Sequence, residues 1–314
     1  MNDAMNQRLA RIVSELRDLT PRFVTAIARF DERARAVEES KDMDDLKRGA
    51  DFWVATAYRN ALIRLRLILE NNFFHLETLN VLATTRYVFE TLVWLRLMDR
   101  EPDYGLVFYG RVISGQLQHF EALRKKLDDE IELFEGLGKE ESALHDNSLK
   151  ELMENVQNVS SDHVAAATAS IMDEIDRKAR RYFSLYAEDA KQNGFGFQAH
   201  LIGKQAIPQV NAQIRELEAN QKALTTTCTA SVRKKLKEHW NWKAEARCVD
   251  MQAQYEFIYS FTSRLLHATP SSIFTDQKNL EVSEMVMFLD YVYVSMLDVL
   301  DLAKRWVGSD EKLN

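Results

Sequence analysis

Two pairs of polar side chains lie four residues apart inside strongly apolar stretches of the sequence. Arg86 and Glu90 occur in LATTRYVFETLVWLRL, and Ser263 and His267 occur in YEFIYSFTSRLLHATP. Side chains four residues apart share one face of an α-helix, so the members of each pair are expected to be neighbours. These four residues are therefore the first candidates for a catalytic site.

Each pair has a structural and a functional interpretation. Arg86 and Glu90 either form a partly buried ion pair that fixes helix register or line a polar pocket between helices. His267, in the last turn of its helix, either caps the helix end or acts as a general acid or base. Ser263 would then be the nucleophile, although no third side chain that could orient the pair is evident in the sequence.

A third candidate is the basic and aromatic run SVRKKLKEHWNWKAEAR. Its composition suits nucleic acid, because cations bind phosphate and indole rings stack on bases. The alternative is a solvated helix face with the tryptophans packed inward. The residues predicted to bind nucleic acid are Arg233, Lys234, Lys235, Lys237, Trp240, Trp242 and Lys243.

Familiar catalytic and metal-binding motifs are absent from the sequence. It contains no Gly-x-x-x-x-Gly-Lys, no His-Glu-x-x-His or Glu-x-x-His, and no Gly-x-Ser-x-Gly. Cys228 and Cys248 lack metal-ligand or redox spacing and are expected to be free thiols. We therefore expect no cofactor and no metal site. The net charge of −7 gives no whole-protein argument for nucleic acid.

The composition predicts an all-α fold, in which a helical bundle core carries a projecting helical arm. Only 10 Gly and 4 Pro occur among 314 residues, too few to punctuate a β-sandwich or a Rossmann unit. No run of about 18 apolar residues occurs, and the N-terminus lacks the apolar core of a signal peptide. We therefore expect no membrane association and a cytoplasmic location.

Hydrophobic periodicity predicts where the helices run. An apolar stripe from Leu9 to Phe30 indicates an N-terminal helix with a break near Thr20, because Thr20-Pro21 has the form of a helix start. Gly136-Leu137-Gly138 is expected to end a helix, and Gly194–Phe197 is expected to form a turn. Further helices are predicted over 51–70, 76–98, 106–135, 205–224, 229–266 and 280–307.

The distribution of apolar and charged residues predicts four segments. Residues 1–48 form N-terminal amphipathic helices, and residues 49–125 with 229–307 form the helical core. Residues 126–228, which are more charged, form the helical arm. Residues 308–314 form a flexible tail.

Two of these motifs resemble an uncharacterised bacterial all-α family, a domain of unknown function. The helix with Arg86-x-x-x-Glu90 and the tyrosine-rich helix ending in Ser263-x-x-x-His267 carry the resemblance. It covers roughly residues 50–125 and 250–300, and it implies a fold but no activity.

A more distant similarity is to the HEPN superfamily, helical ribonucleases of toxin and phage-defence systems. These enzymes use an Arg-x(4–6)-His motif, and Arg233 with His239 has this spacing. Lys234 stands where the superfamily usually has a polar residue such as Asn. The similarity implies a metal-independent ribonuclease with His239 at its active site.

These observations favour a partner-binding scaffold of the bacterial cytoplasm, with a role in stress or phage defence. The partner is another protein or a second copy of the chain, for which the stripe from Leu9 to Phe30 would provide a seam. The alternatives are a metal-independent ribonuclease with His239 or His267 as acid or base, and an RNA- or DNA-binding module. We also expect Arg86, Glu90 and His267 to meet in the core, because a buried ion pair recruits further polar groups.

Overall fold

The computed structural model describes residues 2–38, 49–74, 76–154, 160–266 and 279–308. Every regular element within these ranges is a helix, and they contain no β-strand. The predicted all-α fold is therefore confirmed.

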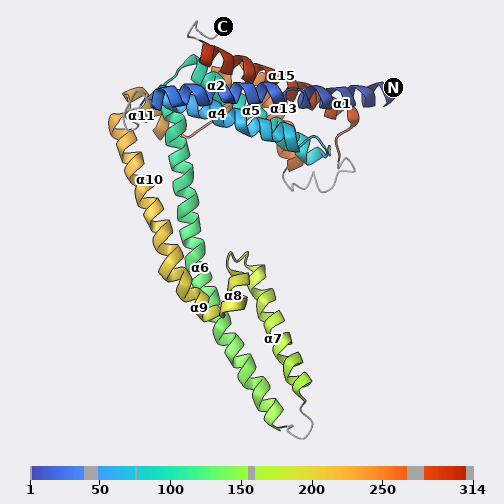
Figure 1. Ribbon diagram of the computed structural model, residues 1–314, viewed down its shortest axis with the longest axis vertical. Coiled ribbons are helices and arrows are strands. Elements are labelled where there is room, and N and C mark those ends of the chain that lie inside the picture. Colours follow the sequence, from blue (N-terminus) through green and yellow to red (C-terminus); the bar gives the residue numbers. More distant parts are fainter. Residues whose placement is uncertain (1, 39–48, 75, 155–159, 267–278, 309–314) are drawn as a thin grey trace. The chain divides into compact units, whose positions relative to one another are not determined.

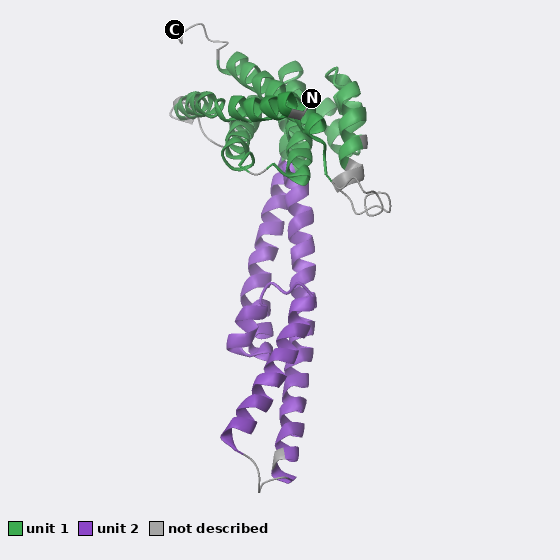
Figure 2. Cartoon of the chain, turned by 90° about the vertical axis from the view of Figure 1, so that its right-hand side faces the viewer, with its two compact units in different colours: residues 1–111, 224–314 green, residues 112–223 purple. Residues whose placement is uncertain are grey.

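The chain divides into two compact units (Figure 2). The first comprises residues 1–111 and 224–314, and the second comprises residues 112–223. The second unit begins and ends earlier than the segment 126–228 that the sequence set apart. Each unit has its own buried apolar residues, and two helices continue from one unit into the other.

Helix α5, Thr78–Arg100, is the centre of the first unit (Figure 1). Its buried residues cover most of the circumference of the helix, while Leu79 and Tyr87 lie on its exposed side. Burying a large apolar side chain contributes about 1.5–3 kcal/mol, so this helix organises the bundle around it. The helices packed against it are α4 (Ala50–Asn71), α12 (Trp242–Cys248), α13 (Gln252–Leu266) and α15 (Val282–Gly308).

The N-terminal apolar stripe packs on its own chain. Helices α1 (Asn2–Arg17) and α2 (Thr20–Glu38) follow one another nearly in line, with the expected break before Thr20 (Figure 1). Helix α1 packs on α15, and α2 packs on both α4 and α15. The stripe is therefore occupied and offers no seam to a second copy. Its buried residues are Ile12, Leu16, Leu19, Phe23, Ile27 and Phe30.

The second unit has a hydrophobic core of its own, although its sequence is highly charged. The core residues are single apolar positions spread over several helices, and they include Leu127, Phe134, Ile175, Phe195 and Ile202. The helices are α6 (Tyr104–Glu154), which starts in the first unit, α7 (Ser161–Arg181), α8 (Ala187–Asn193), α9 (Phe195–Leu201), a π-helical turn (Ile202–Ala206) and α10 (Ile207–Thr227), which ends in the first unit.

The predicted helix end at Gly136–Gly138 is wrong, because α6 continues through it to Glu154. Leu137 is buried in the second core, and a Cβ on Gly138 would lie 3.4 Å from the main-chain nitrogen of Gly196. Gly138 therefore lies inside a helix, at an ordinary contact distance from Gly196, rather than in a turn. The predicted turn at 194–197 is confined to Gly194, whose φ of +85° suits glycine alone.

The single helix predicted over 229–266 is also wrong. This segment contains α11 (Ala230–Lys237), α12 and α13, with two breaks between them. At the first break the Asn241 side chain accepts hydrogen bonds from the main-chain N–H groups of Lys243 and Ala244, which starts α12. At the second break Asp250 adopts a left-handed conformation with φ of +58°.

A substitution at the start of α6 tests its packing on α4. A Cβ on Gly105 would overlap the main-chain oxygen of Ala50 and lie 2.8 Å from Cγ2 of Val54. We expect Gly105→Ala to lower the free energy of unfolding by about 1–3 kcal/mol in urea denaturation followed by circular dichroism. Gly115→Ala, the control in the same helix, adds a methyl group with no neighbour within 4 Å and should not destabilise. Equal stability of the Gly105→Ala protein and the wild type would contradict this packing.

Candidate functional site

Arg86 and Glu90 form the ion pair that their spacing predicts. Arg86 Nε donates to Glu90 Oε1 at 3.0 Å on one face of α5. The two side chains are 30% and 26% exposed, so both are largely removed from water. A pair at this depth must satisfy its remaining hydrogen-bonding capacity with other groups.

The third member of this cluster is Tyr259 of α13. Its hydroxyl donates to Glu90 Oε1, and the Arg86 guanidinium lies 4.4 Å from the centre of its ring. Tyr255, one turn earlier, stacks on Tyr259 with ring centroids 4.5 Å apart. The guanidinium, the two rings and the carboxylate therefore tie α5 to α13.

Tyr259 and Arg86 in this cluster both keep their protons at neutral pH. Burial raises the pKa of Tyr259 above its usual range, and the hydrogen bond to Glu90 and its charge raise it further against the opposing charge of Arg86. Burial lowers the pKa of Arg86, but its interactions with Glu90 and Tyr259 outweigh this and raise it overall. Acid–base catalysis needs a group that exchanges protons near neutral pH, and neither side chain does so. The cluster therefore has the properties of a structural junction.

The other two predicted catalytic residues are not placed. Ser263 belongs to α13, but its side chain and the whole of His267 lie outside the described residues. The expected meeting of Glu90 with His267 therefore stays a prediction. The partner that Glu90 has in the structure is Tyr259. The sequence contained a signal for it, because Tyr259 is four residues before Ser263 and so shares its helix face.

Most cations of the predicted nucleic-acid surface are already bound within the chain. Lys235 pairs with Glu101 at 2.8 Å and covers the ring of Tyr104, and Lys243 pairs with Glu256 at 3.2 Å. Lys234 pairs with Glu238 at 3.9 Å. Charges neutralised in this way attract phosphate weakly, and only Lys237 of the predicted lysines lacks such a contact in the described structure.

Arg233, which has the HEPN-like spacing with His239, is hydrogen-bonded within the chain. Arg233 donates to the main-chain oxygens of Thr225 and Cys228 at the end of α10, where it acts as a helix cap. His239 is exposed and follows the end of α11. The guanidinium is therefore engaged with main-chain carbonyls rather than presented to a phosphate.

The two tryptophans of the basic run are packed rather than open. Trp240 stacks on Trp94 of α5 with ring centroids 4.0 Å apart and an interplanar angle of 10°. Trp242 meets Trp240 edge-on, and the Arg111 guanidinium lies 5.9 Å from the Trp240 ring. A base-stacking platform needs a free ring face, so this arrangement favours a packing role.

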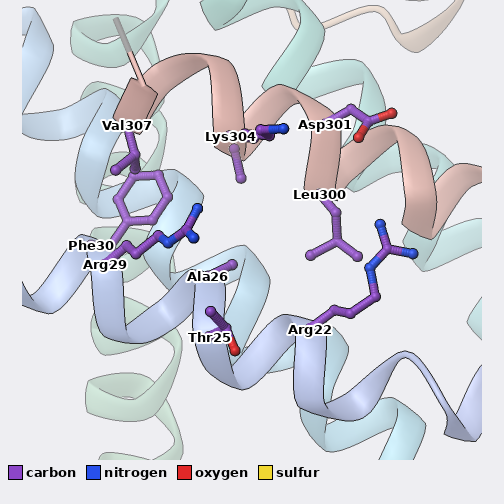
Figure 3. Close-up of a pocket in the computed structure, with 10 residues that line it drawn as sticks. Arg22, Thr25, Ala26, Arg29, Phe30, Leu300, Asp301, Lys304 and Val307 are labelled. Carbon is purple, nitrogen blue, oxygen red and sulfur yellow. The ribbon is translucent and has the colours of Figure 1, made fainter. Parts of the chain in front are cut away.

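A groove between α2 and α15, which the sequence analysis missed, has a different character (Figure 3). Arg22 and Arg29 reach from α2 toward α15, with Ala26 and Leu300 between them (Figure 3). We call this the α2–α15 groove. Its volume is about 230 Å³. Its floor consists of Ala26, Phe30, Leu300, Ala303 and Val307.

The rim of the α2–α15 groove is positively charged. Arg22, Arg29 and Lys304 are exposed and face a single carboxylate, that of Asp301. None of the three cations has an ion-pair partner among the described side chains. An apolar floor with unpaired cations on its rim suits a ligand that is apolar at its centre and anionic at its edges. From the sequence, Arg22 and Arg29 were simply exposed positions of an amphipathic helix.

Comparison with family models, curated proteins and solved structures finds no match for this chain. None of the helices in the described ranges combines the length and apolar character that crossing a bilayer requires. Within the same ranges, no three His, Cys, Asp or Glu side chains are grouped so that they could hold a metal ion.

The cluster on α5 and α13 predicts a loss of stability when its hydroxyl is removed. Tyr259→Phe keeps the ring beneath Arg86 but removes one of the two donors to Glu90 Oε1, leaving the bond from Arg86 Nε. We expect the free energy of unfolding to fall by roughly 1–2 kcal/mol, the low end for bonds to charged groups because the pair is partly exposed. Tyr255→Phe keeps the stacked ring and is the control, with an expected change below about 0.5 kcal/mol. Equal losses in the two variants would show that the hydrogen bond from Tyr259 to Glu90 does not stabilise the fold.

The same hydroxyl predicts a specific dependence on alkaline pH. The pKa of tyrosine is about 10 in an unfolded chain and is raised above that at Tyr259 in the folded protein. Its contribution to stability is therefore complete below about pH 10 and is lost as the pH rises beyond that value. The difference in unfolding free energy between wild type and Tyr259→Phe should shrink as the pH rises from about pH 10 to about pH 12. A difference that stays constant over this interval would contradict the linkage.

Proposed function

We propose that the protein is a docking scaffold that binds an acidic, amphipathic helix of a partner protein in the α2–α15 groove. The observation that carries this proposal is the pair Arg22 and Arg29, two helical turns apart beside an apolar floor and without ion-pair partners among the described residues. A cytoplasmic location and a role in stress or phage defence stay predictions from the sequence.

The size of the groove decides between ligand classes. Sites for cofactors and other small molecules usually measure about 300–1,000 Å³, and this groove measures about 230 Å³. It is too small for most such ligands but can receive one or two apolar side chains from a larger partner. Helix-in-groove recognition works in this way, with apolar anchors on one face of the bound helix.

The spacing of the cations indicates the pattern of the bound segment. Arg22 and Arg29 are seven residues apart, which is about 10 Å along a helix axis. A partner helix laid along α2 matches them with carboxylates at positions i and i+7. Its apolar anchors then fall at i+3 and i+4, over Ala26 and Leu300. Each exposed pair contributes little alone, so the apolar contact and both charges act together.

RNA is a less suitable ligand for this groove. Its floor is aliphatic except for Phe30, which is only 3% exposed, so it offers no open ring for base stacking. Among the described residues, the charges of the basic run are largely paired, as described above. The ribonuclease and nucleic-acid alternatives therefore have less support than protein docking.

Selection from a displayed library of random peptides tests the proposal. We expect the wild-type protein to enrich peptides with carboxylates seven residues apart and apolar residues between them. The double variant Arg22→Glu/Arg29→Glu should bind a selected peptide at least about tenfold more weakly in fluorescence anisotropy, a difference of about 1.4 kcal/mol. The affinity of the protein for a selected peptide should also fall with added salt, because the cations on the rim are exposed to solvent.

The control is Arg11→Glu/Arg64→Glu, which makes the same change in net charge at exposed positions outside the groove. It should bind the selected peptide within about twofold of wild type. Equal weakening in both double variants would mean that net charge alone drives binding. Enrichment of basic peptides, or an RNA oligonucleotide whose binding depends on Arg22 and Arg29, would overturn the assignment to an acidic helix.

A further inference from the structure

A turn in the second unit presents apolar side chains to solvent. Residues 182–186, here called the Phe183 turn, connect α7 to α8. Tyr182, Phe183 and Leu185 are 62%, 89% and 58% exposed. Phe183 has the largest exposed fraction of any large hydrophobic side chain in the described part of the chain. Clusters of exposed apolar groups commonly mark interaction sites.

The Phe183 turn is held in place by groups of the same unit. The Lys126 ammonium donates to the main-chain oxygen of Tyr182 at 2.7 Å. Glu130, whose side chain is fully buried, accepts a hydrogen bond from the N–H of Leu185. Burying a carboxylate is costly unless it is paired, and Glu130 also pairs with Lys126 at 3.5 Å, so the two side chains fix the turn together.

The backbone of the turn is also strained. Phe183 has a φ of +52°, a conformation that residues other than glycine rarely adopt. Strain of this kind tends to occur where a side chain must be aimed in a particular direction. Here it accompanies the exposure of the phenyl ring. The turn therefore has the features of a preformed contact rather than of a loose connection.

The first unit contains an apolar groove that is unlike the α2–α15 groove. It lies between α13 and α15, has a volume of about 360 Å³ and is called the α13–α15 groove. Its residues include Phe257, Ile258, Met287, Phe288 and Tyr291, and cations are absent from its lining. Phe257 and Met287 are 46% and 42% exposed. This volume accommodates an aromatic side chain together with an aliphatic one.

We propose that the Phe183 turn of one copy of the chain binds in the α13–α15 groove of a second copy. A convex apolar turn and a concave apolar groove are both presented by the same chain, and such a head-to-tail contact joins copies into rings or open chains. The charges beside the two surfaces are opposite, because Arg181 adjoins the turn and Glu284, which also accepts a hydrogen bond from the N–H of Glu281, lies one helical turn before Met287 and Phe288. The inference is independent of the proposed acidic-helix site.

A membrane surface is a weaker candidate for the occupant of the turn. Recognition of anionic lipid typically uses clusters of four to eight Lys or Arg side chains. Beside the turn, Arg180 is instead paired with Asp176 at 3.0 Å and with Glu188 at 2.6 Å. These carboxylates repel anionic head groups. The geometry and charge of the turn therefore favour an apolar protein pocket.

Sedimentation velocity over a range of protein concentrations tests the proposal. The weight-average mass of the full chain should rise with concentration. Phe183→Asp in the turn and Met287→Glu in the groove should each raise the dissociation constant at least about tenfold. Phe197→Asp is the control, since Phe197 is 57% exposed but belongs to neither surface, and it should associate like the wild type. Circular dichroism establishes that each variant is folded.

Mixing the two variants gives the sharpest result. The Phe183→Asp protein keeps an intact groove, and the Met287→Glu protein keeps an intact turn, so together they should form one-to-one dimers and nothing larger. A wild-type mass that does not change with concentration would overturn the proposal, as would association that survives Met287→Glu. Phosphatidylserine vesicles that bind the wild type but not Phe183→Asp, without self-association, would assign the turn to a membrane instead.

Discussion

The first unit depends on burying most of the surface of α5 although this helix carries charged residues. Each charge is matched by a neighbouring helix: Glu90 accepts from Tyr259 of α13, and Arg96 pairs with Asp298 of α15 at 2.7 Å. Main-chain groups are used as well, since the Tyr58 hydroxyl of α4 donates to the oxygen of Leu95. A buried charge without a partner would cost several kcal/mol, so these matches restrict how the surrounding helices can be placed.

Fold class and local pairing could be predicted from the sequence because both depend on neighbours along the chain. Scarcity of glycine and proline indicated an all-α fold, and the spacing of Arg86 and Glu90 predicted their ion pair. Helix ends were less predictable. Gly136 and Gly138 are residues typical of a helix terminus, yet α6 continues through them, and Leu137 between them is buried in a core that exists only after folding. Tyr259 was overlooked because an aromatic residue in an apolar helix is ordinarily part of the core.

Charged side chains in the sequence were a poor guide to charge available for binding. The run around Lys235 and Lys243 was predicted to bind nucleic acid, yet Glu101 and Glu256 from other helices neutralise these two lysines. Arg22 and Arg29 attracted no notice in the sequence, and they remain unpaired in the described structure. Whether a cation is available for binding depends on its distance from carboxylates elsewhere in the fold. The local sequence does not give this distance. The candidate site therefore came from the structure rather than from the motifs.

Because α6 and α10 continue from one unit into the other, they restrict which insertions and deletions of codons the protein tolerates. Residues 112–223 are joined to the rest of the chain by two helices that continue across the boundary, α6 from Tyr104 to Glu154 and α10 from Ile207 to Thr227. A loop absorbs an inserted or deleted codon, but a helix turns by about 100° for each residue gained or lost. Near these two crossings, length variation should therefore be tolerated mainly in steps of whole helical turns. Single-codon insertions and deletions should instead accumulate in the connections outside the helices, where no rotation is propagated.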